Sequence, residues 1–86
     1  MYIVYILKSF KNRRIYIGYS TDVHKRVIEH NENKVISTRG KGPWKLVYFE
    51  SFLSKEDALK REKLLKNYGS ALGHLKKRIS NSLSQI

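Results

Sequence analysis

The sequence has no cysteine among its 86 residues, and this absence excludes several kinds of chemistry. Without thiols the chain has no disulfide, no thiolate zinc site and no cysteine nucleophile, which fits a cytoplasmic location. Long apolar runs are also missing, since the run that begins at Met1 breaks at Lys8. A membrane span needs roughly 20 apolar residues, so we expect a cytoplasmic protein with no membrane partner.

Acidic residues are scarce in comparison with basic ones. Lysine and arginine together number 18, against 7 aspartates and glutamates, which gives a formal net charge of +11. Such an excess favours binding to a polyanion, because neutralising phosphates releases their condensed counterions. Solubility or binding to anionic lipid would use the same charge, but for a single domain this basic we expect nucleic acid as the partner.

Three segments of the chain have the composition of β-strands. β-branched and aromatic residues dominate residues 2–7 and 15–19, and the short polar turn between them predicts an antiparallel hairpin. Residues 44–52 form a third such segment, which follows a loop over 34–43 that contains glycine and proline. Because residues 2–7 are apolar on both alternating faces, we expect this strand to be covered on both sides.

Helices are expected in much of the remaining sequence. A first helix follows Asp22, one of three adjacent residues suited to an N-cap, and a second helix runs from its cap Ser54 to about Asn67. Gly69 stands where a C-terminal break belongs, and a last helix is expected over about 70–80.

These elements predict one layered domain, which is what a chain of this length supports. The fold class is α/β: a three-stranded antiparallel sheet flanked by helices, in the order strand, strand, helix, strand, helix, helix. The domain is expected to cover residues 1–80. Residues 81–86 are expected to form a loose C-terminal tail.

One acidic residue interrupts the face of the second long helix that should pack on the sheet. The stripe consists of Ala58, Leu59, Glu62, Leu65 and Lys66. Burying an unpaired carboxylate is expensive, so Glu62 requires an explanation. Either it bonds an internal arginine such as Arg26, or it faces a cleft and coordinates a hard cation such as Mg²⁺.

Arg26 and His30 lie one turn apart on the stripe of the first helix. A single histidine in such a place is more often structural than catalytic. Beside Arg26 the pair is more informative, because arginine binds phosphate in a bidentate manner and imidazole moves protons near neutral pH.

Two tyrosines, Tyr5 and Tyr16, are placed on neighbouring strands, where aromatic pairs usually serve packing. Gly18 follows Tyr16 on the same face of its strand. We expect the missing side chain to leave open space beside the Tyr16 hydroxyl, where a ligand approaches closely.

Together these residues resemble the GIY-YIG nuclease superfamily. The resemblance covers about residues 2–67, and the motifs that carry it are Ile3-Val4-Tyr5, Tyr16-Ile17-Gly18, Asp22-x-x-x-Arg26-x-x-x-His30 and Ala58-x-x-x-Glu62-x-x-Leu65-Lys66. Ile3 stands where the family has its first glycine. The chain is most similar to the small bacterial stand-alone proteins of this group. It also resembles the GIY-YIG catalytic domains of excinuclease and of the eukaryotic structure-specific endonuclease.

The resemblance implies a DNA endonuclease that hydrolyses phosphodiester bonds with one Mg²⁺ or Mn²⁺ ion, with a place in DNA repair or recombination. It implies that Glu62 holds the metal and that Arg26 neutralises charge on the phosphate. Either Tyr16 or His30 removes the proton from the attacking water, and Tyr5 positions that water or the base.

The other basic residues are expected to contact the DNA backbone, with no motif that reads bases. With the strand glycine included, the candidate DNA-binding residues are Lys8, Arg13, Arg14, Gly18, Arg39, Lys41 and Lys66. Two other functions are compatible with the sequence. One is a non-catalytic nucleic-acid-binding module on the same fold, and the other is an interaction domain that supports a larger repair complex. A protein partner for targeting would fit any of the three.

Overall fold

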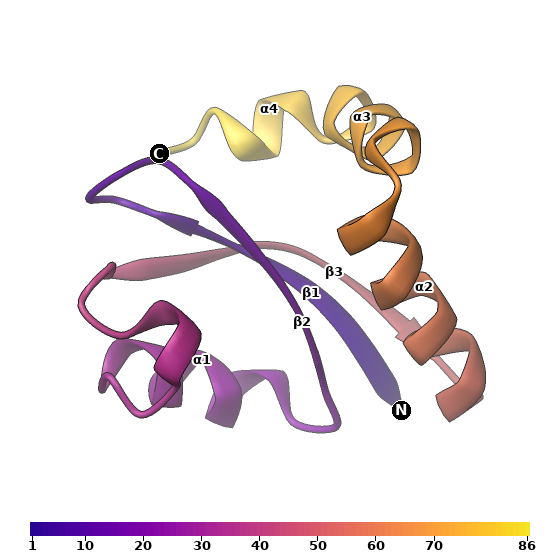
Figure 1. Cartoon of the computed structure of the whole chain (residues 1–86), viewed down its shortest axis with the longest axis horizontal. Helices are drawn as coiled ribbons and strands as arrows, with labels where there is room; N and C mark the ends of the chain where they lie inside the picture. The colour runs from indigo at the N-terminus through magenta and orange to yellow at the C-terminus, as the bar shows by residue number, and fades with distance from the viewer.

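The computed structural model describes all residues, 1–86, as a three-stranded antiparallel sheet with helices on both faces (Figure 1). The elements are β1 (Tyr2–Ser9), β2 (Ile15–Ser20), α1 (Val23–Asn31), the 3₁₀ turn η1 (Ile36–Thr38), β3 (Trp44–Phe52), α2 (Lys55–Asn67), α3 (Gly69–Arg78) and α4 (Ser80–Leu83). The strand order is β2-β1-β3, so β1 is central and β2 is a free edge. The predicted fold class and strand arrangement are confirmed.

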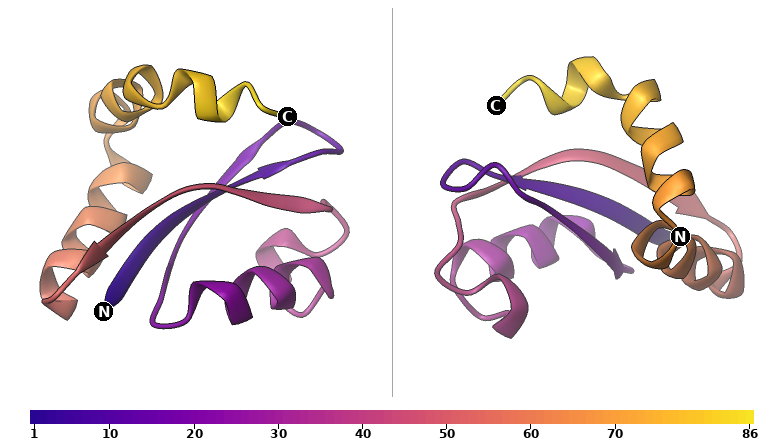
Figure 2. Two further views of the ribbon diagram at one scale, coloured as in Figure 1. Left: turned by 180° about the vertical axis from the view of Figure 1, so that it is seen from behind. Right: turned by 45° about the horizontal axis from the view of Figure 1, so that its top comes forward.

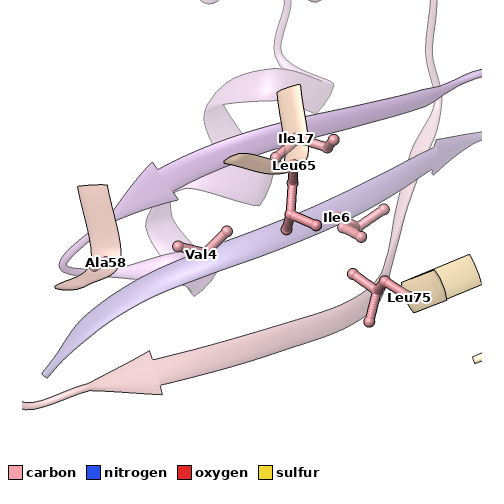
Figure 3. Packing of buried hydrophobic residues seen from close by; sticks show 6 residues of the cluster. All are labelled: Val4, Ile6, Ile17, Ala58, Leu65 and Leu75. Atoms are coloured by element: carbon pink, nitrogen blue, oxygen red, sulfur yellow. The ribbon is translucent and has the colours of Figure 1, made fainter. Parts of the chain in front are cut away.

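Successive side chains of β1 point to opposite faces of the sheet, so the core has two layers. Val4 and Ile6 face the side covered by α2 and α3, where the buried residues are Val4, Ile6, Ile17, Ala58, Leu65 and Leu75 (Figure 3). Tyr5 and Leu7 face the other side, where they pack with Val23 of α1 and with Trp44. Figure 2 shows α1 and α3 on opposite sides of the sheet. A strand covered on both sides was expected from its apolar composition.

Helices α1 and α2 begin at the predicted caps. The Asp22 side chain accepts a hydrogen bond from the backbone N–H of Lys25 at 3.1 Å, and the Ser54 hydroxyl accepts one from Asp57 at 3.4 Å. Each cap satisfies a donor that the helix itself leaves unpaired. None of the helices has the length and apolarity needed to cross a bilayer.

Two expectations for the C-terminal region are wrong. Gly69 is not the residue that breaks α2: the helix ends at Asn67, its C-cap is the extended residue Tyr68 (φ −124°, ψ 104°), and Gly69 is the first residue of α3. Residues 81–86 are not a loose tail, because α4 covers part of them and the remainder lies against the β1–β2 hairpin (Figure 1). Lys8 Nζ donates to the Leu83 carbonyl at 2.7 Å, and Arg13 donates to the Ile86 carbonyl at 2.7 Å.

An ion pair joins α2 to the edge strand β3. Arg61 donates to both carboxylate oxygens of Glu50, with an Nη2–Oε2 distance of 2.9 Å, and the Tyr48 hydroxyl donates to the same carboxylate at 2.7 Å. Burial and these contacts act on Glu50 in opposite directions, and the hydrogen bonds prevail, so its pKa lies below the usual value. The cluster is structural and lies apart from the residues considered next.

Candidate active site

The candidate site surrounds the free edge of β2. Tyr16 packs on the α1 side of the sheet, whereas the next residue, Ile17, faces α2 on the opposite side. Lys66 of α2 nevertheless lies with its ammonium 5.8 Å from the centroid of the Tyr16 ring. Helices from both faces therefore reach the same strand edge, and this arrangement brings residues from β1, β2, α1 and α2 together.

Tyr5 is the buried centre of this group, at 1% exposure. Its hydroxyl lies 2.9 Å from Nε2 of His30, and its ring lies directly over Gly18, the residue paired with it on β2. A Cβ atom at Gly18 would overlap the Tyr5 ring. The predicted reason for this glycine is therefore wrong: the space above Gly18 is filled by Tyr5 and is not open to a ligand.

The aromatic rings contact each other at tilted and edge-on angles. Ring centroids are 6.3 Å apart for Tyr5 and Tyr16, 4.8 Å for Tyr16 and His30, and 6.4 Å for Tyr16 and Trp44. Such arrangements stabilise an aromatic cluster and restrict ring rotation. Tyr16 contacts three rings of this cluster and remains partly exposed at the strand edge.

His30 is completely buried, and both of its ring nitrogens have partners. Nε2 faces the Tyr5 hydroxyl, and Nδ1 lies 2.7 Å from the hydroxyl oxygen of Thr38. Burial, assisted by the positive charge of Arg26, lowers the pKa of His30 to about 4, so the ring is neutral at pH 7. Neither ring nitrogen is therefore free to accept a proton directly from a water molecule.

The charged residues of the group lie around the tyrosines. Burial raises the pKa of Tyr5 to about 12, with smaller contributions from Tyr16 and Glu62, while the nearby Arg26 guanidinium acts in the opposite direction. Arg26 also forms a half-exposed ion pair with Glu29 at 3.2 Å. The structure thus brings together all five predicted catalytic residues: Tyr5, Tyr16, Arg26, His30 and Glu62.

Glu62 lies at the rim of the site, with its side chain 20% exposed. Its partner is Lys66, with an Oε2–Nζ distance of 3.1 Å, and not Arg26, so the predicted alternative of an internal arginine pair is wrong. No group of three or more histidines and carboxylates is placed to hold a metal. One carboxylate nevertheless suits Mg²⁺, which keeps several waters and takes the rest of its ligands from substrate phosphate.

The predicted DNA-binding residues are spread over the surface, and several bond within the chain. Lys8 and Arg13 hold the C-terminal segment, as described above. Arg39 donates to the Asn33 carbonyl at 3.1 Å, and Lys41 Nζ donates to the Ser37 carbonyl at 3.2 Å, while both side chains remain exposed. Lys66 is the residue of this set that lies at the candidate site itself.

Thr38 is the member of the site that the sequence did not reveal. It is a loop residue eight positions after His30, and nothing in its neighbourhood in the sequence marks it as buried. Its contact with His30 depends on how the loop between α1 and β3 folds back over the helix. Only the tertiary structure shows that contact.

Comparison with known proteins shows to which family the chain belongs. The family model described as the GIY-YIG catalytic domain matches residues 1–77. The chain therefore belongs to the GIY-YIG domain family, whose members are usually nucleases.

Individual relatives are UPF0213 proteins, a group of small stand-alone GIY-YIG proteins. A UPF0213 protein of Haloquadratum walsbyi is 44% identical over 66 residues, which are 76% of this chain and 73% of that protein. One from Clostridium perfringens is 45% identical over 64 residues, 73% of this chain and 68% of that protein. The solution NMR structure of a UPF0213 protein from Bacillus halodurans matches with a TM-score of 0.59 and 32% identity, covering 99% of this chain and 95% of the other.

Proposed function

We propose that the protein is a metal-dependent DNA endonuclease that hydrolyses phosphodiester bonds and acts on DNA structures formed in repair or recombination. The observation that carries this proposal is the position of Glu62. It is a partly exposed carboxylate that lies close enough to the tyrosine pair to influence the pKa of Tyr5. Tyr5 in turn lies beside His30 and Arg26, so the carboxylate belongs to a group that also contains phenols, an imidazole and a guanidinium, and phosphodiester hydrolysis requires groups of these kinds.

Glu62 would hold a single Mg²⁺ or Mn²⁺ ion. When bound, such an ion withdraws charge from the scissile phosphate and stabilises the leaving oxygen. The protein supplies one anionic ligand, and a substrate phosphate and water would supply the others. This donor set suits an ion that binds together with the substrate and is held weakly in its absence.

Arg26 binds the phosphate in this proposal. Its ion pair with Glu29 joins neighbours on one helix and is half exposed, and such pairs contribute little free energy. A phosphate, whose oxygens share negative charge, can therefore replace Glu29 as the partner of the guanidinium. In that position Arg26 would neutralise the charge that develops on the phosphate during hydrolysis.

Tyr16 is the better supported of the two candidate bases. Both ring nitrogens of His30 are occupied, and the ring has no exposed surface. Tyr16 is partly exposed and lies beside the Lys66 ammonium, 5.8 Å from the centroid of its ring. We therefore assign deprotonation of the attacking water to Tyr16. Tyr5, which is buried against the Tyr16 ring, would position this base, and His30 would hold Tyr5 in place.

Lys66 links the metal ligand to the base. Its ammonium is 3.1 Å from the Glu62 carboxylate in a pair whose lysine side chain is 44% exposed. A divalent ion at Glu62 would compete with this ammonium, and the weak pair allows the exchange. The displaced Lys66 would then contact the DNA phosphate or remain over Tyr16.

Binding to DNA would be mainly electrostatic. A net charge of +11 predicts affinity for the phosphate backbone that decreases steeply as salt is added. The exposed side chains Arg14, Arg39 and Lys41 are available for such contacts. The sequence holds no motif that would read base edges, so we expect the DNA to be chosen by its shape more than by its sequence.

A nicking assay distinguishes this function from a non-catalytic nucleic-acid-binding module. Supercoiled plasmid and labelled branched duplexes are incubated with the protein in Mg²⁺, in Mn²⁺ and in EDTA. The proposal predicts cleavage with either metal and none in EDTA. Binding to the same DNAs without cleavage in either metal would instead support the non-catalytic module.

A further inference from the structure

A chain of buried hydrogen bonds extends from Tyr5 to the loop that precedes β3. The Tyr5 hydroxyl lies 2.9 Å from His30 Nε2, and His30 Nδ1 lies 2.7 Å from Thr38 Oγ1. The Thr38 hydroxyl lies 3.4 Å from the Val35 carbonyl oxygen. All three side chains are at most 1% exposed, so these groups bond to one another without competition from solvent.

Thr38 is held firmly from both sides. Its backbone N–H donates to the Val35 carbonyl at 3.2 Å, and its own carbonyl accepts from the Trp44 indole at 3.4 Å. The residue ends the short turn η1, and its position therefore depends on tertiary packing around Trp44. A hydroxyl fixed in this way can impose a direction on the hydrogen bonds of the imidazole next to it.

The donors and acceptors along the chain favour one direction. A neutral imidazole has one N–H donor and one acceptor nitrogen. If the Thr38 hydroxyl donates to the Val35 carbonyl, its lone pairs accept from Nδ1–H, and Nε2 accepts the proton of Tyr5. In the reverse direction Nε2–H donates to Tyr5, and the buried Tyr5 proton then has no acceptor, because His30 is the one hydrogen-bond partner of that hydroxyl and the nearby Arg26 is itself a donor. Leaving a buried donor unpaired is costly, so the first direction is preferred.

We propose that Thr38 is a positioning residue for the proposed cleavage reaction: by accepting the Nδ1–H bond it fixes the tautomer of His30, and His30 then fixes the direction of the Tyr5 hydroxyl. The Tyr5 proton points at His30, so its lone pairs face Arg26. Tyr5 then offers its oxygen to the Arg26 guanidinium and its ring to Tyr16, and it holds these two groups in place for the reaction. Thr38 touches neither the substrate nor the reacting atoms and acts only through the other two residues. This role rests on the proposed nuclease function, but the tautomer of His30 does not.

The first test of this proposal is ¹⁵N NMR of the histidine ring nitrogens in metal-free protein without DNA. At pH 7 we expect wild-type His30 to have a protonated Nδ1 and an unprotonated Nε2. Thr38→Val should change that pattern, since valine cannot accept the bond, and Thr38→Ser should preserve it. Thr21→Val, at the exposed threonine before α1, should leave it as in the wild type.

A cleavage assay on the same variants completes the test. Thr38→Val should reduce the cleavage rate by roughly tenfold or more, and Thr38→Ser should restore it. The proposal is overturned if wild-type His30 has its proton on Nε2, or if Thr38→Val alters the tautomer while cleavage is unchanged. If Thr38→Val does not fold, the spectra of the wild type and Thr38→Ser still decide the tautomer. A wild-type protein that never cuts would remove the nuclease function and leave the tautomer result standing.

Discussion

The phenol ring of Tyr5 lies directly over Gly18, its partner in the register between β1 and β2. The glycine thereby gives the buried tyrosine room to lie across the neighbouring strand, with its hydroxyl at His30. The packing of β1 on β2 and the placement of the Tyr5 hydroxyl at His30 therefore both depend on this pair. Gly18, in the second triplet of the family motif, thus supports Tyr5, in the first triplet.

Gly18→Ala is expected to damage both stability and cleavage. The added methyl group would overlap the Tyr5 ring and displace it from His30, and overpacking of this kind typically costs about 1–3 kcal/mol in the free energy of unfolding. Urea denaturation and the nicking assay measure the two effects. Gly73→Ala is the matched control, because nothing lies near that position in α3 and alanine favours a helix. Equal behaviour of the two variants would contradict the role assigned to Gly18.

Lys66→Met is expected to tighten metal binding and to slow cleavage. Removing the ammonium beside Glu62 eliminates a competitor for the carboxylate, which should increase Mn²⁺ affinity roughly twofold to fivefold, the worth of a partly exposed pair. Cleavage should fall because the cation next to Tyr16 is lost. Electron paramagnetic resonance of free Mn²⁺ gives the affinity, with Lys60→Met on the same helix as the control. An unchanged or weaker affinity in Lys66→Met would disprove the competition.

Arg61→Met is expected to destabilise the protein without involving the candidate site. Glu50 would lose its bidentate partner while the carboxylate stays only 17% exposed, and a half-satisfied buried acceptor costs roughly 1–3 kcal/mol. Adding Glu50→Gln should recover part of this loss, because the unpaired charge is then absent. Urea denaturation of both single variants and the double variant measures the coupling. Strictly additive effects would show that the pair contributes nothing.

The stability of the protein should fall in mild acid because of His30. Its pKa is about 4 in the folded state, below the ordinary value of 6.5, so between these values the unfolded chain binds a proton that the folded protein does not. Stability is therefore complete above pH 6.5 and declines as the pH falls toward 4, by roughly 3 kcal/mol. Denaturation of wild type and His30→Asn across this range isolates the effect. The same pH dependence in both proteins would show that His30 is not responsible.

Much of the fold could be predicted because local signals and tertiary packing agree. The strand over 44–52 and the helix from its Ser54 cap to Asn67 have the predicted bounds, since apolar alternation and capping act within a few residues. The C-terminal segment was mispredicted for the opposite reason. Its helix and its contacts with Lys8 and Arg13 depend on a hairpin more than sixty residues earlier, and no local pattern records that.

The candidate site could likewise be predicted only in part from the sequence. Motif spacing brought Tyr5, Tyr16, Arg26, His30 and Glu62 into consideration, and the structure brings these residues together. Their roles depend on burial and on partners, which spacing does not show. The complete burial of His30, the pairing of Glu62 with Lys66 and the contact of Thr38 with His30 all follow from how loops and helices meet around the edge of β2.

Cleavage of DNA by Glu62→Gln tests the central claim most directly. Glutamine keeps the size of the side chain but removes the negative charge that a divalent ion requires, so Mg²⁺-dependent and Mn²⁺-dependent cleavage should fall at least about a hundredfold while DNA binding persists. Glu56→Gln removes the same charge from an exposed position on the same helix and should cut at the wild-type rate. A Glu62→Gln protein that cuts as fast as wild type would contradict the account.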